Sequence, residues 1–447
     1  MKLIKLKNKL SVFALMTTLR SLMKDSLYGN SIYLILSTAI MAVLGFFTWI
    51  LIAKFFTPHQ VGLATTLISI TSLIANLSLM GLNVGMIRYL PTSARKNERI
   101  NTTFIIVIIT SVIASLIYLA GIDIFSPKLN FVKSNFLLIA LFVLFIVVFS
   151  LDLITESIFI AYRKSSYVLI KNACISILKL GLPFLLISLA FYGIFLAISL
   201  ATSAALIISI VILIKKLNYK FSPQINGEIV KSMAKFSFGN YIAASLTQLP
   251  NLILPIMITN QLNPKTSAFY YVSMMIANFL YVIPSATAES LFAEGSHNEK
   301  SLKSNSIRAT KIILGLATPA VLFIIIFGKF ILSFFGEEYA TQGYPFLVML
   351  AVSTIFLAAT RIFATILKIN HKIKELIISY IISTFFILFF SYSFLQFGLI
   401  GIGYAWLLGK MILAVCLFIS VIYNKHKYLK GALSSNLAKI RMNYFKI

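Results

Sequence analysis

Apolar residues follow one another in uninterrupted runs of about 20 along most of the chain, separated by short polar connections. A helical run of that length crosses roughly 30 Å of hydrocarbon at about 1.5 Å per residue. Reading the runs against a window of about 20 residues predicts twelve membrane-spanning helices. We expect them at Ser31–Ala53, Val61–Met86, Phe104–Ile122, Phe136–Ile160, Val168–Ser188, Gly193–Ile214, Ser237–Thr259, Ser267–Ser290, Ile312–Phe335, Pro345–Leu367, Leu376–Leu395 and Leu399–Ile422.

Composition agrees with this pattern and excludes a water-soluble fold. Of the 447 residues, 59% are hydrophobic and 11% are charged, whereas soluble domains have about 25% charged residues. The two cysteines lie in separate apolar runs and the four histidines are scattered over connections, so no disulfide framework, metal-ligand spacing or cofactor is expected. The expected fold is an all-α polytopic membrane protein.

The basic connection after the sixth predicted span is the best boundary between two halves. We expect an interfacial N-terminal segment at 1–30, because lysines precede a short apolar stretch there without a convincing cleavage site. The predicted domains are then a first lobe at 31–214, a linker at 215–236, a second lobe at 237–422 and a basic tail at 423–447.

The net charge of +27 comes from 39 lysines and arginines that are unevenly distributed. The N-terminus, the connections after the even-numbered spans, the adjoining helix ends and the C-terminal tail hold 32 of them, and the opposite side holds five. This asymmetry predicts that both termini lie in the cytoplasm. The basic excess therefore orients the chain and meets anionic lipid head groups, and it does not indicate nucleic-acid binding.

Two stretches of the chain resemble each other at an offset of 206 residues. "AKFFTPHQVGLATTLISI" from Ala53 aligns with "TNQLNPKTSAFYYVSMMI" from Thr259, which places Pro58 on Pro264. Because each half would contain an even number of spans, the halves would be related by an axis along the membrane normal.

The stretches "VGLAT", "GLNVGMIRYLP", "FGNYIAASLTQLPNLILP" and "FGEEYATQG" resemble bacterial and archaeal polysaccharide transporters. These are the oligosaccharide-lipid flippases of the multidrug/oligosaccharidyl-lipid/polysaccharide exporter superfamily. The resemblance implies two six-helix lobes around a central cavity, alternating access, and a polyprenyl-pyrophosphate-linked saccharide as substrate. The resemblance also implies the proteins of polysaccharide assembly as possible partners.

Charged residues inside a membrane span are expensive, by about 3 kcal/mol at the bilayer centre, and each is therefore a candidate functional residue. Asp152 and Glu156 lie four residues apart and share one face of the fourth span. Lys179 on the fifth span can reach Asp152 if the two helices are neighbours. Two interpretations stay open here: a proton- or cation-responsive carboxylate pair held by a lysine, and an ion pair that joins helices.

Arg361 on the tenth span, Lys410 in the middle of the twelfth and Lys179 are candidate ligands of the pyrophosphate. Arginine binds such oxyanions through two parallel hydrogen bonds. At the 206-residue offset, Arg361 corresponds to Thr155, beside Glu156, so pairing of Arg361 with Asp152 or Glu156 is the alternative. For Lys410 the alternatives are snorkelling and a carboxylate partner.

Four further polar residues complete the candidate site. Gln248 and Asn251 on the seventh span are suited to hydrogen-bonding sugar hydroxyls, or to bonds between helices. Arg88 and Glu289 lie at the cytoplasmic ends of the second and eighth spans, where solvation makes the free-energy cost of a charge low. Their two interpretations are gate contacts and ordinary helix-end residues.

The sequence thus favours a flippase for lipid-linked oligosaccharides in the cytoplasmic membrane. The alternative is a cation-coupled multidrug exporter of the same superfamily, which commonly carries a carboxylate in its first or seventh span; the spans predicted here contain none. An enzyme is disfavoured, because the longest outward connection, Asp123–Asn135, has one acid and no histidine.

Overall fold

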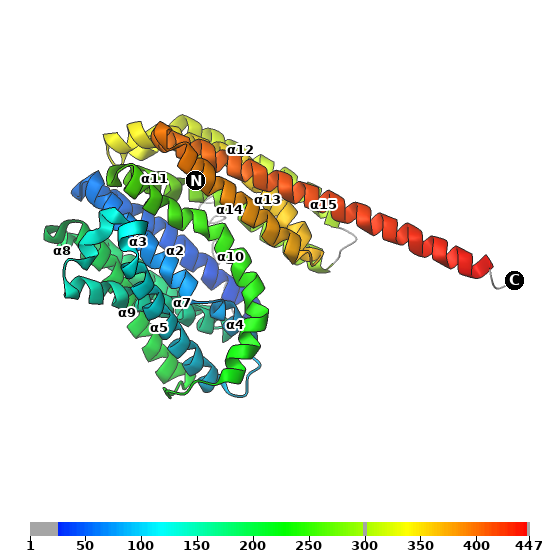
Figure 1. Ribbon diagram of the computed structural model, residues 1–447, viewed down its shortest axis with the longest axis horizontal. Helices are drawn as coiled ribbons and strands as arrows, with labels where there is room; N and C mark the ends of the chain where they lie inside the picture. The colour runs from blue at the N-terminus through cyan, green and yellow to red at the C-terminus, as the bar shows by residue number, and fades with distance from the viewer. Residues whose placement is uncertain (1–25, 298–301, 445–447) are drawn as a thin grey trace, which may run out of the picture. The chain divides into compact units, whose positions relative to one another are not determined.

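The computed structural model describes residues 26–297 and 302–444, and in these ranges the chain forms helices joined by short connections (Figure 1). Twelve of the described helices are long and apolar enough to cross a membrane, as predicted. They are α2 (Ser26–Phe55), α3 (Pro58–Ser78), α5 (Lys96–Ala120), α7 (Phe136–Ala161), α8 (Ser165–Leu185), α9 (Ala190–Leu217), α10 (Gly227–Gln261), α11 (Pro264–His297), α12 (Leu302–Ser333), α13 (Glu337–Ile369), α14 (Ile373–Ser393) and α15 (Gly398–Tyr444).

The predictions for the N-terminal segment and the C-terminal tail are tested by the structure to different extents. Most of the expected interfacial segment 1–30 lies outside the described residues. The expected tail at 423–447 begins inside α15, which continues without a break to Tyr444. The location of both termini in the cytoplasm stays a prediction.

The second predicted span is interrupted, and the prediction of one helix over Val61–Met86 is wrong. Met80 and Gly81 have positive φ angles of 47° and 81°, so the chain leaves the right-handed helix after α3 and restarts as the short helix α4 (Leu82–Tyr89). The carbonyl groups at the end of α3 need other partners. Thr110 donates to the Ser78 carbonyl at 2.8 Å, and the Tyr241 hydroxyl donates to the Leu77 carbonyl at 3.0 Å.

The chain folds into two compact units, each with its own apolar core. The first comprises Met1–Tyr241 and Pro255–Ala268, and the second comprises Ile242–Leu254 and Phe269–Ile447. In the first unit α2 packs on α8, and α7 packs on α5 and α9; in the second, α13 packs on α12 and α15, and α14 on α15 (Figure 1). The predicted domain boundaries, with a linker at 215–236, stay a prediction.

The first part of the predicted linker is bound to α5. Asn101 of α5 donates to the Lys220 carbonyl at 3.1 Å, and Thr102 accepts from the Asn226 amide at 3.1 Å. The Tyr219 hydroxyl donates to Asn101 Oδ1 at 2.5 Å, and burial raises the pKa of Tyr219 to about 12, so this phenol remains a donor at neutral pH. Beyond this contact α10 starts at Gly227, ten residues before the predicted span.

Matched turns in the two halves support an internal repeat. Thr57 and Asn263 cap the starts of α3 and α11, and Pro58 and Pro264 follow them as first helical residues, at the predicted offset of 206. The turns after α7 and α13 also match. Arg163 and His371 both have a φ of 56°, and the following amide in each turn bonds back five residues to Phe159 or Leu367.

These later turns lie 208 residues apart, which corrects the predicted offset for this part of the repeat. The turns before α9 and α15 give the same value: Ala190 and Gly398 have φ angles of 53° and 60° and follow the 3₁₀ turns η2 (Ile187–Leu189) and η4 (Leu395–Phe397). Arg361 therefore corresponds to Leu153, the neighbour of Asp152, rather than to Thr155.

Candidate functional site

Asp152 and Glu156 of α7 lie together with a lysine of α8 inside the first unit. That lysine is Lys171, whose side chain has no exposed surface. Its Nζ lies 2.8 Å from Asp152 Oδ2 and 3.3 Å from Glu156 Oε2, and it donates to the Asp152 backbone carbonyl at 3.0 Å. The three donors of the ammonium group therefore have three acceptors, and one lysine is shared by two carboxylates.

The predicted pairing of Asp152 with Lys179 is corrected by this geometry. Lys179 is half-buried two turns further along α8, and among the described residues it forms no ion pair. Its charge acts on Asp152, but more weakly than that of Lys171.

Lys171 was missed because its place near the start of the fifth span suggested an ordinary helix-end lysine. The hairpin register contains the signal that would have identified it. Arg163 lies in the turn between α7 and α8; Glu156 is seven residues before it and Lys171 is eight residues after it. Two residues at nearly equal distances from a tight antiparallel turn lie at similar depth, because both helices rise by the same amount per residue.

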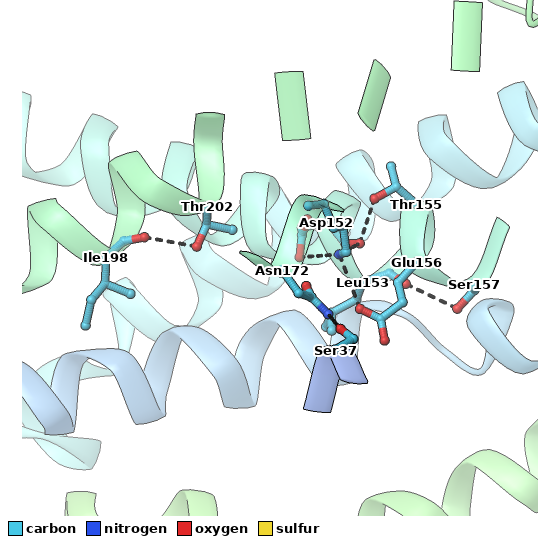
Figure 2. A network of polar contacts seen from close by, with 10 residues as sticks. Ser37, Asp152, Leu153, Thr155, Glu156, Ser157, Asn172, Ile198 and Thr202 are labelled. Atoms are coloured by element: carbon cyan, nitrogen blue, oxygen red, sulfur yellow. Dashed lines mark hydrogen bonds and ion pairs between the residues drawn. The ribbon is translucent and has the colours of Figure 1, made fainter. Parts of the chain in front are cut away.

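Neutral polar contacts surround the charged cluster and connect it to two more helices (Figure 2). Asn172, next to Lys171, donates to Ser37 Oγ of α2 at 2.9 Å, and Thr155 donates to the Asp152 carbonyl at 2.8 Å. Two residues before Asp152, Ser150 accepts from Ser111 of α5 at 2.8 Å. Asp152 Oδ1, in contrast, is buried and has no hydrogen-bond partner among the described residues.

The second unit contains a different charged site, centred on Lys410 of α15. The Lys410 ammonium lies over the ring of Trp406, 4.5 Å from its centroid, one helical turn away. Trp406 Nε1 donates to the Tyr281 hydroxyl of α11 at 3.3 Å, and this hydroxyl is 3.0 Å from Ser353 Oγ of α13. Three helices thus hold the indole ring on which the ammonium rests.

Two more cations of α13 belong to the same region of the second unit. The Arg361 charge acts on both Lys410 and Lys368, and Glu289 of α11 acts on Lys368. Arg361 and Glu289 have exposed side chains. Within this unit, neither Arg361 nor Lys410 forms an ion pair with any carboxylate that the structure describes.

The remaining predicted residues lie in simpler surroundings. Asn251 donates to the exposed Gln248 at 3.4 Å, which places both amides on one face of α10. Arg88 is exposed near the end of α4, with its guanidinium 5.7 Å from the ring centroid of Tyr89. Among residues 26–297 and 302–444, no group of three or more His, Cys, Asp or Glu side chains could hold a metal ion.

Solved structures with the same fold are membrane transporters. An inward-facing multidrug resistance MATE family transporter of the MOP superfamily matches with a TM-score of 0.69 at 16% identity, covering 89% of this chain and 99% of that one. The lipid II flippase MurJ in an inward closed conformation matches with a TM-score of 0.71 at 16% identity, covering 87% of each chain. A MOP superfamily transporter from Pyrococcus furiosus, described as having a binding pocket of reverse polarity, matches with a TM-score of 0.57 at 15% identity, covering 89% and 94%.

The twelve spans and this fold define the class: a multi-pass membrane protein with the fold that these MOP superfamily structures share. A family model described as "Polysaccharide biosynthesis protein" matches residues 27–292, which is more than half of the chain. The chain belongs to that family. No curated protein compared with the chain matches it. Family and fold both agree with the flippase or exporter that the sequence favours.

Proposed function

We propose that the protein is a flippase that moves a polyprenyl-pyrophosphate-linked oligosaccharide, or a related polysaccharide precursor, across the cytoplasmic membrane by alternating access. The observation that carries the proposal is the pair of cations Arg361 and Lys410 in the second unit, which lie within electrostatic reach of each other and have no carboxylate partner in the described part of that unit. Membership of the polysaccharide biosynthesis family supports the same substrate class.

The energetics of Lys410 favour an anionic ligand. A charge at the bilayer centre costs about 3 kcal/mol, and Lys410 stands near the middle of the span Leu395–Asn424. The cation–π contact with Trp406 stabilises the Lys410 ammonium by about 0.5–2 kcal/mol. The nearby Arg361 adds repulsion, so the site is left with an unbalanced positive charge that a pyrophosphate, with two or more negative charges, would neutralise.

The other predicted residues receive roles consistent with such a substrate. The neighbouring amides of Gln248 and Asn251 are suited to sugar hydroxyls, and Lys179, which has no ion pair among the described residues, is a third candidate ligand for the pyrophosphate. Arg88 and Glu289 remain candidate gate residues. We also propose that both termini face the cytoplasm, from which the substrate would enter, while the polyprenyl tail stays in the lipid.

The cations disfavour the alternative function, an exporter of cationic drugs. A positively charged substrate would be repelled by Arg361 and Lys410, and neither the span Gly29–Phe55 nor the span Tyr241–Gln261 contains a carboxylate that could attract it. We therefore expect no efflux of cationic dyes from cells that express the protein.

The test replaces each candidate cation by glutamine in cells that depend on this gene for surface polysaccharide. A hydrogen bond to a charged group contributes about 1.5–3 kcal/mol, so R361Q, K410Q and K179Q should each lower export about tenfold or more at unchanged membrane abundance. Lys329, an exposed lysine of α12 in the second unit, supplies the matched control K329Q, which should export normally. Normal export by all three site variants would contradict the proposal.

A further inference from the structure

We propose that the cluster of Asp152, Glu156 and Lys171 is a proton-binding site, in which Asp152 Oδ1 takes up the proton and Glu156 connects the site to water. The inference deepens the proposed function, on which it rests for its physiological meaning, because it supplies the ion that would drive the transporter.

The distribution of acceptors identifies the atom that would bind the proton. Lys171 donates to Asp152 Oδ2 and to Glu156 Oε2, at 2.8 Å and 3.3 Å. Asp152 Oδ1 has no donor among the described residues, although Asp152 is only 8% exposed. A buried oxygen of this kind is costly while the carboxylate is charged. A proton on Oδ1 would remove that charge and leave Oδ2 as an acceptor for the ammonium.

The position of Lys171 decides between a proton and a metal ion. A sodium ion shared by two carboxylates would need the space between them, where the ammonium of Lys171 already lies. The three residues together carry one net negative charge when all are ionised, which a single proton balances. The exchangeable ion of this site is therefore a proton.

Exposure decreases stepwise through the cluster and indicates the route of the proton. The Glu156 side chain is 35% exposed, that of Asp152 is 11% exposed, and that of Lys171 has no exposed surface. The proton would come from water that reaches the Glu156 carboxylate and would pass to Asp152. With Asp152 neutral, the ammonium keeps Glu156 as its one ionised partner, and the link between α7 and α8 weakens at Asp152.

Other charged groups on the elements around α7 lie near helix ends. α8 contributes Lys171 and Lys179, the two cations that act on Asp152, and α7 itself contributes Glu156. The charged or titratable residues of the other packed helices are Tyr33 and Lys54 of α2, His59 of α3, Arg88 and Tyr89 of α4, Lys96, Glu98, Arg99 and Tyr118 of α5, Lys128 and Lys133 of the 3₁₀ helix η1 (Pro127–Lys133), and Tyr192, Lys215 and Lys216 of α9. The charges that act on Asp152 are those of Lys171, Glu156 and Lys179, so these three residues set its behaviour.

The sequence allows an unusually specific test, because the chain has three aspartates, Asp25, Asp123 and Asp152. In the variant D25N/D123N, carboxyl-¹³C-labelled aspartate reports on Asp152 alone. The full chain is placed in lipid nanodiscs without substrate, and the labelled carboxyl is followed by infrared or NMR spectroscopy as the pH is lowered. We expect reversible conversion from carboxylate to acid in the mildly acidic range.

Two results would overturn the proposal. One is a carboxyl that stays ionised down to about pH 4, where aspartate in water takes up its proton, as an ion pair that only joins the helices would. The other is a carboxyl that stays protonated at every pH.

A second variant tests the role of the lysine. K171Q should move the midpoint of proton uptake upward by about one pH unit or more, a tenfold change in proton affinity, because the ionised form loses its cation. An unchanged midpoint would show that Lys171 does not govern the site. If K171Q does not fold, the titration of the labelled D25N/D123N variant still decides whether Asp152 binds a proton, because that variant leaves Asp152, Glu156 and Lys171 unchanged. The two proposals fail separately. If Asp152 does not take up a proton, the proposed pyrophosphate site is not contradicted. If the Arg361 and Lys410 variants export normally, the proposed proton-binding site is not contradicted.

Discussion

A lysine with no exposed surface depends entirely on the acceptors around it, and Lys171 has three. Removing one partner of a buried ion pair typically costs about 3–5 kcal/mol, because the other charge remains buried and unpaired. We expect K171M to lower the free energy of unfolding by about that amount, measured by thermal unfolding in detergent.

The matched control is K179M, two helical turns further along α8 in the same unit. Lys179 has no ion pair among the described residues, so this variant should be clearly less destabilised. Adding D152N and E156Q to K171M should restore most of the loss, because no unpaired charge then remains. Equal effects of K171M and K179M would contradict the assignment of Lys171 as the shared partner.

The pair Asp123 and Lys133 shows the contrasting behaviour of an exposed ion pair. It lies in the connection formed by α6 (Ile122–Phe125) and η1 (Pro127–Lys133), with Lys133 Nζ 2.8 Å from Asp123 Oδ2. The hydrogen bond from Lys133 lowers the pKa of Asp123 below its ordinary value. The pair therefore stabilises the fold above the ordinary pKa of about 3.9, and this contribution is lost as the pH falls through the lowered value.

We expect K133Q to raise the pKa of Asp123 back toward about 3.9, measured by NMR on labelled aspartate. Because the Asp123 side chain is 61% exposed, thermal stability at neutral pH should hardly change. A pKa of Asp123 that does not respond to K133Q would show that the hydrogen bond is not formed in solution.

At the scale of helices, the two hairpins α8–α9 and α14–α15 need a glycine at the same place. A Cβ on Gly193 would lie 2.1 Å from the Leu186 carbonyl oxygen, and one on Gly401 would lie 2.0 Å from that of Phe394. Both clashes are with backbone, which cannot rotate away. We expect G193A and G401A each to destabilise the protein by about 3 kcal/mol, at the upper end of overpacking costs, measured by thermal unfolding.

Gly181 of α8 and Gly315 of α12 are the controls for this pair, since a Cβ at either position meets nothing within 4 Å. In a helix interior, alanine is favoured over glycine by about 1 kcal/mol, so G181A and G315A should be neutral or stabilising. A difference in sign between Gly193 and Gly401 would argue against the repeat.

The helices themselves were predictable from sequence, because run length and apolar character suffice to recognise a span. Their details were less so. The break at Met80 and Gly81 occurs inside a run that stays apolar, so no change of hydropathy marks it. The change of offset from 206 to 208 was hidden because the turns around Arg163 and His371 share a backbone conformation and not a sequence.

The candidate site was predictable as a set of residues but not as a set of partners. Asp152, Glu156, Arg361 and Lys410 were found because a charge in a span is conspicuous. The aromatic support of Lys410 was not, since Trp406 is one apolar residue among many until Tyr281 fixes its indole. Packing between distant segments decides such partners, and the hydropathy pattern does not contain it.

At the scale of the whole molecule, the two units carry charges of different character at their sites. The first has two carboxylates sharing one lysine. The second has Arg361 and Lys410, which form no ion pair with a carboxylate in the described part of that unit. If the first site binds a proton and the second binds the pyrophosphate, each function should be separable by mutation. K410Q should then lose export and retain the titration of Asp152, because Lys410 and the proton-binding cluster belong to different units.

D152N should behave in the opposite way. The substitution leaves the Arg361 and Lys410 pair intact. The affinity of the purified variant for a pyrophosphate-bearing lipid should therefore stay within about twofold of that of the unmodified protein. A lost interaction of about 1.4 kcal/mol would change the affinity tenfold. Export should fall and become independent of the pH difference across the membrane. Binding is measured with a polyprenyl pyrophosphate in nanodiscs, and export in cells at two external pH values. Loss of lipid binding in D152N, or export that still follows the pH difference, would contradict the assignment of proton binding to the first unit and pyrophosphate binding to the second.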